Sequence, residues 1–261
     1  MKHANWPDVL DVFLWGFTIV ARPTLRQVLY GYDLDSDAQV DRLMRRLERK
    51  KLVKRSGRGG KAEFRITDIG MRQSPTLSPQ PAWDKPWDSR WRAVVFDFPV
   101  VRRKDYLRLW KALRERKFGL LQGSIWIWPH DIESILLEIT DAKGIPECFC
   151  GIESHRLFLC TDREVVAASW DFEEIEKHHS AYLKQAALFT AGMRSAKKLG
   201  QLAAFARGER QSYLHAFSRD PLLPQALWPK AYHGFRVEES HLQFRRLLRQ
   251  RFSELAATPG K

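Results

Sequence analysis

RWRAVVFDFPVVRRKDYLRLWKALRERKFG, residues 90–119, joins a short apolar strand to a helix crowded with arginine and lysine. β-Branched and aromatic residues predict a strand from Trp91 to Phe98, and apolar residues at helical spacing predict a helix from Arg103 to Lys117. Asp97 stands near the end of the strand. A carboxylate there either binds a catalytic metal or belongs to the scaffold, and the surrounding sequence bears on that choice.

The chain after this stretch alternates strand and helix patterns. LLQGSIWIWP, residues 120–129, predicts two short strands about Gly123, and a second helix is expected from about Asp131 to Ala142. SHRLFLC, Ser154 to Cys160, predicts the last strand. The resulting order, strand–helix–strand–strand–helix–strand, is ferredoxin-like.

The first third of the chain predicts three helices followed by a basic hairpin. The second helix is short and begins at Pro23, and Ser36 with Gln39 fits a capping box that opens the third. LVKRSGRGGKAEFRIT, residues 52–67, predicts a strand, a glycine-rich turn and a strand. Three helices followed by such a hairpin form a winged helix-turn-helix, so the expected fold class is a multidomain α+β protein.

The charge of the chain is concentrated in this first third. The whole chain carries a net charge of +13, and the segment from Arg42 to Arg65 contains eleven Lys or Arg against two Glu, which makes +9. Such a segment either binds double-stranded DNA or is a solvated basic surface. The predicted DNA-binding residues are Gln39, Arg42, Arg45, Arg46, Arg49, Lys54, Arg55, Arg58 and Lys61. Since one module reads few base pairs, a homodimer on a two-fold operator is expected.

Composition limits the remaining functions. No apolar run approaches the roughly 18 residues that span a bilayer, so no membrane partner is expected. Three cysteines and the lack of a signal-peptide pattern indicate the cytoplasm. No nucleotide-binding or hydrolase signature occurs, and no cofactor is expected. His178 and His179 are expected to form a solvated surface pair rather than a metal site.

Proline-rich sequence divides the chain. SPTLSPQPAWDKPW, residues 74–87, contains four prolines and predicts a stiff, extended linker. Asp171 and Glu174 fit a further capping box, and more helices are expected near Ala196–Phe217 and Glu239–Ala256. The expected domains are 1–73, winged helix; 74–88, linker; 89–165, ferredoxin-like and dimerising; and 166–261, helical.

Four sequence landmarks resemble those of one family. WDSRWRAVVFDFP, GSIWIWPHD, ASWDFEEIEKHHSAYL and RDPLLPQALWP occur here in the order in which the PaaX family, the repressors of phenylacetate-degradation operons, has similar motifs. The resemblance implies a winged helix, a central domain similar to the small CRISPR adaptation endonuclease, and a mostly helical C-terminal domain. It also implies a dimeric repressor that releases DNA on binding an aryl-acyl coenzyme A thioester, typically phenylacetyl-CoA.

The resemblance sharpens the two readings of Asp97. In the CRISPR adaptation proteins an aspartate at the matching position is held to bind a divalent metal across a dimer axis, so the alternative function is a metal-dependent nuclease. Otherwise Asp97 forms a turn or a salt bridge beside Arg102 and Arg103, retained from a shared fold. A third hypothesis is an adaptation-type protein that binds DNA without effector or chemistry.

The resemblance also directs attention to an effector site in the last third. Candidate residues are Tyr213, His215, Arg219 and Trp228, because arginine suits phosphates and aromatic rings suit an aryl group. Each of them can equally serve to pack the helical domain. The sequence alone does not locate the pocket.

Overall fold

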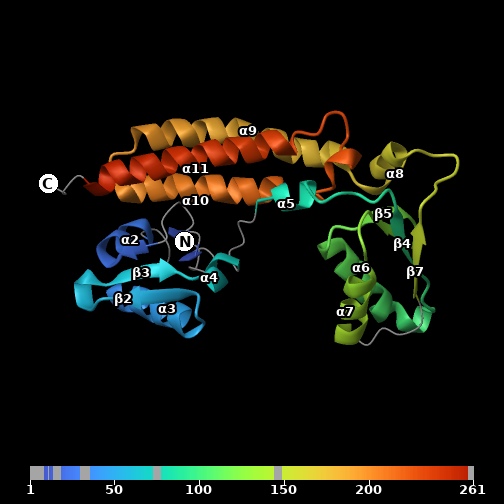
Figure 1. Cartoon of the computed structure of the whole chain (residues 1–261), viewed down its shortest axis with the longest axis horizontal. Helices are drawn as coiled ribbons and strands as arrows, with labels where there is room; N and C mark the ends of the chain where they lie inside the picture. The colour runs from blue at the N-terminus through green and yellow to red at the C-terminus, as the bar shows by residue number, and fades with distance from the viewer. Residues whose placement is uncertain are drawn as a thin grey trace. The chain divides into compact units, whose positions relative to one another are not determined.

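The structure is a computed structural model of the whole chain, and it describes residues 9–10, 12–13, 19–29, 36–72, 78–143 and 149–257 (Figure 1). Two compact units make up the chain. Unit 1 comprises Met1–Leu77, Ala181–His215 and Phe235–Lys261, and unit 2 comprises Ser78–Ser180 and Ala216–Gly234. The predicted mixed α+β architecture is confirmed, with a four-stranded antiparallel sheet in the middle of the chain and a helical C-terminal part. No helix in the described ranges is long and apolar enough to cross a membrane.

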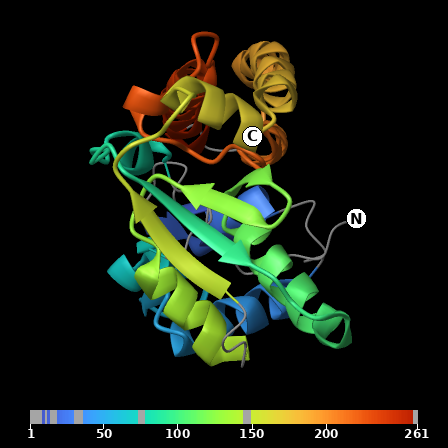
Figure 2. The ribbon, with the colours of Figure 1, turned by 90° about the vertical axis from the view of Figure 1, so that its right-hand side faces the viewer.

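A four-stranded sheet forms the centre of unit 2. Its strands are β4 (Trp91–Phe96), β5 (Gly119–Gln122), β6 (Ile125–Trp128) and β7 (Phe149–Ser154), in the order β5-β6-β4-β7 with antiparallel neighbours (Figure 2). The helices of this segment are α6 (Arg103–Glu115) and α7 (Glu133–Lys143). The predicted strand–helix–strand–strand–helix–strand order therefore agrees with the structure.

The last strand lies earlier in the chain than predicted. β7 pairs with β4 from Phe96↔Phe149 to Trp91↔Ser154, whereas the prediction placed the strand at Ser154–Cys160. Residues 155–161 instead form an irregular connection to α8 (Asp162–Ser169). The prediction was wrong because it rested on the short apolar run at residues 157–160, whereas the ladder with β4 selects a segment that includes Gly151 and Glu153. α8 was not predicted, although Thr161 and Glu164 form its capping box.

The two faces of the sheet are covered by different elements. Val94, Phe96 and Trp126 pack with α6 and α7, where Leu109, Leu113 and Ile139 are buried. On the other face Trp91 and Ile127 pack with Val165 and Val166 of α8. Because successive strand residues point to opposite faces, Trp126 and Ile127 belong to different cores.

An ion-pair cluster holds the start of β4. Arg92 is 8% exposed, and its guanidinium donates to Asp88 at 2.6 and 2.8 Å and to Glu153 Oε2 at 2.8 Å. The hydrogen bond from Arg92 lowers the pKa of the Asp88 carboxyl to about 2. The polar residues in the landmark sequence WDSRWR thus fix the strand to the segment before it and to β7.

A buried polar cluster joins three further parts of unit 2. Asp220 is 1% exposed and accepts hydrogen bonds from Tyr232 Oη at 2.7 Å and from the Leu222 amide at 2.7 Å. The Trp83 indole donates to the same Tyr232 hydroxyl at 3.1 Å. Trp83 ends a short helix, α5 (Gln80–Trp83), so the prediction of an extended linker is wrong at these residues. The first turn of a helix tolerates proline, so Pro81 does not prevent α5 from forming. Burial of the Trp83 indole stabilises this short helix.

His179 belongs to the same cluster. It lies on α9 (Phe172–Ser195), its side chain is fully buried, and its Nε2 is 3.1 Å from Asp220 Oδ2. The alignment falls outside that of a hydrogen bond, so charge attraction carries the contact. Its Nδ1 is 3.4 Å from Glu176. The prediction of a solvated histidine pair is therefore wrong for His179, because the carboxylate it meets is far along the chain.

The stability of unit 2 is expected to depend on the charge of His179. Burial opposes the charged ring, but Asp220 and Glu176 outweigh it and hold the pKa of His179 above its usual value. Its contribution should thus be complete below the unfolded pKa of about 6.5 and be lost as pH rises through the folded pKa. Urea unfolding from pH 6 to 9 measures this slope. The variant His179→Gln should flatten it, and an unchanged slope in that variant would contradict the assignment.

Unit 1 combines N-terminal elements with the C-terminal helices. The former are β1 (Ile19–Ala21), α2 (Arg22–Leu29), α3 (Asp37–Arg49), β2 (Val53–Ser56), β3 (Glu63–Ile66) and α4 (Asp68–Arg72). The latter are the second part of α9, α10 (Leu199–Ala216) and α11 (Gly234–Ala257), which lie side by side (Figure 1). One hydrophobic cluster contains Val40 and Phe64 together with Met193, Leu202 and Phe244. Unit 1 therefore combines residues from the expected winged-helix domain, 1–73, with residues from the expected helical domain, 166–261.

Candidate nucleic-acid interface

The third predicted helix, α3, presents a row of arginines. Its capping box is confirmed, since Ser36 Oγ accepts the Gln39 amide at 3.3 Å and Gln39 Oε1 accepts the Ser36 amide at 3.1 Å. Val40, Met44 and Leu47 are buried, which turns the opposite side outward. Exposed side chains on that side are Gln39, Arg42, Arg45, Arg46 and Arg49. Because the cap engages Gln39 Oε1, this residue is less suited to reading a base than the arginines beside it.

The arginines of α3 lack acidic partners among the residues that the structure describes. Arg45 Nε donates to the Asp41 backbone carbonyl, at 3.4 Å, and not to a carboxylate. Within the part of the chain that the structure describes, no ion pair joins Arg42, Arg46 or Arg49 to a carboxylate. Solvated surface helices commonly interleave glutamate at i+4 spacing. The guanidinium groups of α3 therefore remain available for an anionic partner.

The hairpin β2–β3 places like charges opposite each other. Lys54 is paired with Arg65 in the ladder, and both side chains are exposed. Two cations directly opposite on one face repel each other and destabilise the isolated hairpin. A bound anion between them would relieve this repulsion. Arg65 was not among the predicted site residues, because its place opposite Lys54 is set by the register of the two strands.

The turn of the hairpin depends on glycine and carries two more cations. Gly57 and Gly59 have φ of 77° and 58°, a region that glycine enters without strain. Arg58 and Lys61 are exposed in this turn. Arg55 differs from them, because its guanidinium lies 5.9 Å from the centre of the buried Phe64 ring. Part of its role is thus to cover the core.

The structure around Asp97 bears on the metal-site and salt-bridge hypotheses for this residue. Asp97 is exposed after β4, and no ion pair links it to other described residues. Arg102 Nε instead binds Asp105 Oδ2 at 3.0 Å, three residues along the chain. Among the described residues no group of three His, Cys, Asp or Glu could hold a metal ion.

Two family models match most of the chain beyond the N-terminal elements. The model of the PaaX protein central Cas2-like domain matches residues 84–166, and the model of the PaaX-like protein C-terminal domain matches residues 170–257. The chain belongs to the PaaX-like family. Proteins of this family are typically transcriptional regulators rather than enzymes.

A solved structure supports the fold of this PaaX-like chain. It is the uncharacterized protein Rv0674 from Mycobacterium tuberculosis, with a TM-score of 0.53 and 15% sequence identity, and the alignment covers 91% of this chain and 99% of that one. At such identity the likeness concerns the fold alone. The comparison with curated proteins gave no match.

The predicted effector residues of this PaaX-like protein are spread over both units. Tyr213 and His215 belong to unit 1, whereas Arg219 and Trp228 belong to unit 2. His215 and Arg219 are exposed. The Trp228 indole donates to the Leu223 carbonyl at 2.9 Å and meets Trp83 edge-on at 5.4 Å, so this residue packs its own unit.

Tyr213 lies in a buried polar cluster that the sequence did not reveal. Its hydroxyl donates to Glu238, and its ring stacks on His241 at 3.9 Å. His241 Nδ1 lies 2.8 Å from Glu209 Oε1, which also accepts from Tyr182 Oη at 2.5 Å. Burial raises the pKa of both tyrosines, which keeps them protonated as donors. The sequence signal that could have revealed this cluster is the presence of Glu209, Glu238 and His241 among the apolar residues of α10 and α11.

Proposed function

We propose that this PaaX-like protein is a sequence-specific transcriptional regulator that binds double-stranded DNA through α3 and the β2–β3 hairpin. The observation that carries the proposal is the cationic surface of these elements, in which the α3 arginines have no acidic partner among the described residues and Lys54 faces Arg65. A surface with that charge is suited to phosphates. α3 has the width that a major groove admits.

The arrangement of the N-terminal elements supports a winged helix. α2 and α3 precede a twisted hairpin whose turn carries Arg58 and Lys61. In such a module the last helix reads base edges, and the wing meets the neighbouring backbone. We assign the arginines of α3 to base contacts, and Lys54, Arg58, Lys61 and Arg65 to phosphates.

The regulator is further proposed to be a dimeric repressor that an acyl-CoA-type ligand, such as phenylacetyl-CoA, releases from its operator. The family supports this extension, with residues 89–165 as the dimerising part and the C-terminal helices as the part that responds to ligand. Within unit 1, Arg207 Nη1 of α10 donates to the Val28 carbonyl of α2 at 3.0 Å. A ligand that altered α10 would therefore act on α2, the helix that precedes the DNA-binding helix α3 in the chain.

Gel-shift titration tests the proposal. The full-length chain is titrated against DNA from upstream of its own gene and against a scrambled duplex of equal composition, at physiological salt. Tighter binding to the upstream DNA by a factor of about 10³ or more is expected for a specific regulator. Equal affinity for both duplexes would refute the proposal. Phenylacetyl-CoA, with free CoA as control, tests the repressor and effector parts.

The wing should contribute affinity without sequence preference. Replacing Arg58 or Lys61 by alanine is expected to weaken binding to upstream and scrambled DNA by the same factor and to lower the salt slope by about one unit each, since each contact releases one counterion. Binding isotherms across a salt series measure both quantities. Arg103→Ala, an exposed arginine of α6, serves as the control for charge alone. A selective loss of the upstream site in Arg58→Ala would assign base reading to the wing.

The nuclease alternative rests only on the position of Asp97 after β4. A magnesium or manganese cleavage assay that compares the wild type with Asp97→Asn distinguishes it from the regulator. Cleavage that the substitution abolishes would support the nuclease, and the regulator predicts none.

A further inference from the structure

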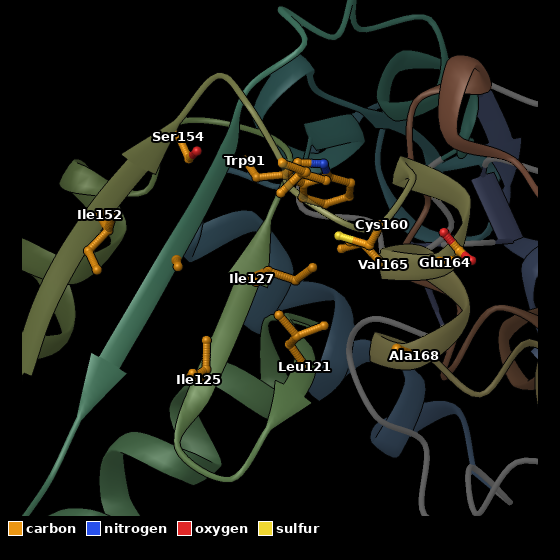
Figure 3. Close-up of a pocket in the computed structure, with 12 residues that line it drawn as sticks. Trp91, Leu121, Ile125, Ile127, Ile152, Ser154, Cys160, Glu164, Val165 and Ala168 are labelled. Carbon is orange, nitrogen blue, oxygen red and sulfur yellow. The ribbon is translucent and has the colours of Figure 1, made fainter.

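Unit 2 contains an apolar cavity of about 350 Å³ on the face of the sheet opposite α6 and α7 (Figure 3). Strand side chains form one wall, and α8 with the preceding connection forms the other (Figure 3). The inner end is built by Trp91, Ile127 and Val165, which are 4%, 3% and 5% exposed. Four residues of the lining are exposed and mark the open side of the cavity, here called its mouth: Ile152, Cys160, Glu164 and Ala168.

The polar groups of the lining are already engaged with the protein. Trp91 Nε1 donates to Asp162 Oδ1 at 2.8 Å. Ser154 Oγ donates to the Arg156 carbonyl at 2.9 Å. Glu164 accepts the amide and the hydroxyl of Thr161 at 2.7 and 2.8 Å in the cap of α8. The cavity therefore offers a ligand shape and apolar contact, with no convergent hydrogen-bonding groups.

The charge of the lining restricts the ligand further. Glu164 is the one charged residue among the twelve that line the cavity, all of them described, and no Lys, Arg or His is included. The hydrogen bonds from Thr161 lower the pKa of Glu164, so this carboxyl is ionised at neutral pH. An anionic group at the mouth would be repelled by Glu164 and would find no cation among the twelve lining residues.

We propose that this cavity binds a small uncharged molecule with an aromatic or branched aliphatic body larger than benzene. An apolar cavity of about 150 Å³ already accepts benzene, and ligand pockets begin near about 300 Å³. The ring enters between Trp91, Ile127 and Val165, and any polar end of the ligand stays at the mouth. The site concerns unit 2 alone and does not depend on DNA binding.

A small ligand suits this cavity better than a second protein chain. The side chains at its inner end are at most 5% exposed, so a flat protein surface would gain little apolar contact from them. The exposed side chains of the lining, Ile152, Cys160, Glu164 and Ala168, are the ones that a protein surface could reach most readily. A stable dimer interface buries about 800 Å² on each partner, which requires a broader exposed apolar face.

Fluorine NMR with two matched probes tests the proposal. 4-Fluorobenzyl alcohol is uncharged and 4-fluorobenzoate is an anion of nearly the same shape. The full-length wild type should bind the alcohol at least ten-fold more tightly than the benzoate. Glu164→Gln, which preserves the cap because glutamine also serves in a capping box, should narrow that ratio several-fold.

Two neighbouring alanines of α8 provide a matched pair of variants. Ala168 lines the cavity and Ala167 does not, and both are exposed. Ala168→Phe should fill the cavity and weaken binding of the alcohol at least ten-fold, while Ala167→Phe should bind it as the wild type does. Equal binding by the two variants, or no binding of the alcohol to the wild type, would overturn the proposal. So would a loss of self-association in Ala168→Phe alone, measured by sedimentation velocity, because a second copy would then cover the cavity.

Discussion

At least one alanine replacement among Arg42, Arg45 and Arg46 is expected to weaken operator binding by about 5- to 150-fold and to relax preference at one base pair, since a bidentate arginine–guanine contact contributes about 1–3 kcal/mol. The three side chains are exposed on α3, opposite the buried residues Val40 and Met44. Guanidinium groups present two parallel donors, which match the acceptors on the guanine edge.

The comparison needs both cognate and altered operators. Binding of Arg42→Ala, Arg45→Ala and Arg46→Ala is measured on the upstream DNA and on duplexes with single base-pair changes. Because none of these side chains supports the core, urea unfolding of each variant should match that of the wild type. If all three variants lose affinity uniformly over every duplex, α3 binds phosphate and does not read bases.

Replacing Asp220 by alanine is expected to lower the free energy of unfolding of unit 2 by about 3–5 kcal/mol, the range for removing one partner of a buried ion pair. The substitution leaves the Tyr232 hydroxyl and the Leu222 amide without their acceptor, and His179 without the nearer of its two carboxylates. Asp220→Asn should have a smaller effect, because its amide oxygen can still accept one of these bonds.

Tryptophan fluorescence during urea unfolding reports on this effect, because eight of the ten tryptophans lie in unit 2. Asp171→Ala is the matched control. Asp171 is exposed and its carboxylate caps α9 by accepting the Glu174 amide at 2.9 Å, so loss of this side chain should cost about 1 kcal/mol. Equal destabilisation by Asp220→Ala and Asp171→Ala would show that the buried cluster does not hold the unit together.

The sequence alone was sufficient to predict the features that depend on residues close together in the chain. The capping box of Ser36 and Gln39, the apolar stripe of α3 and the glycine turn of the hairpin each involve neighbours in the chain. The order of strands and helices in unit 2 also followed from local periodicity. The DNA-binding hypothesis belongs to the same class, because clustered charge is visible without a fold.

Tertiary structure decided what depends on contacts between distant residues. The ladder with β4, and not the apolar run at residues 157–160, selected Phe149–Ser154 as the last strand. The sequence predicted His179 to lie on the surface, whereas in the fold it is buried beside Asp220. Lys54 lies opposite Arg65 only because of the strand register. The cavity beside α8 likewise required the sheet and a helix that local patterns had missed. Backbone propensity and capping act within a turn or two of chain, whereas strand register and the burial of charge are set by free energies that exist only once distant segments have packed.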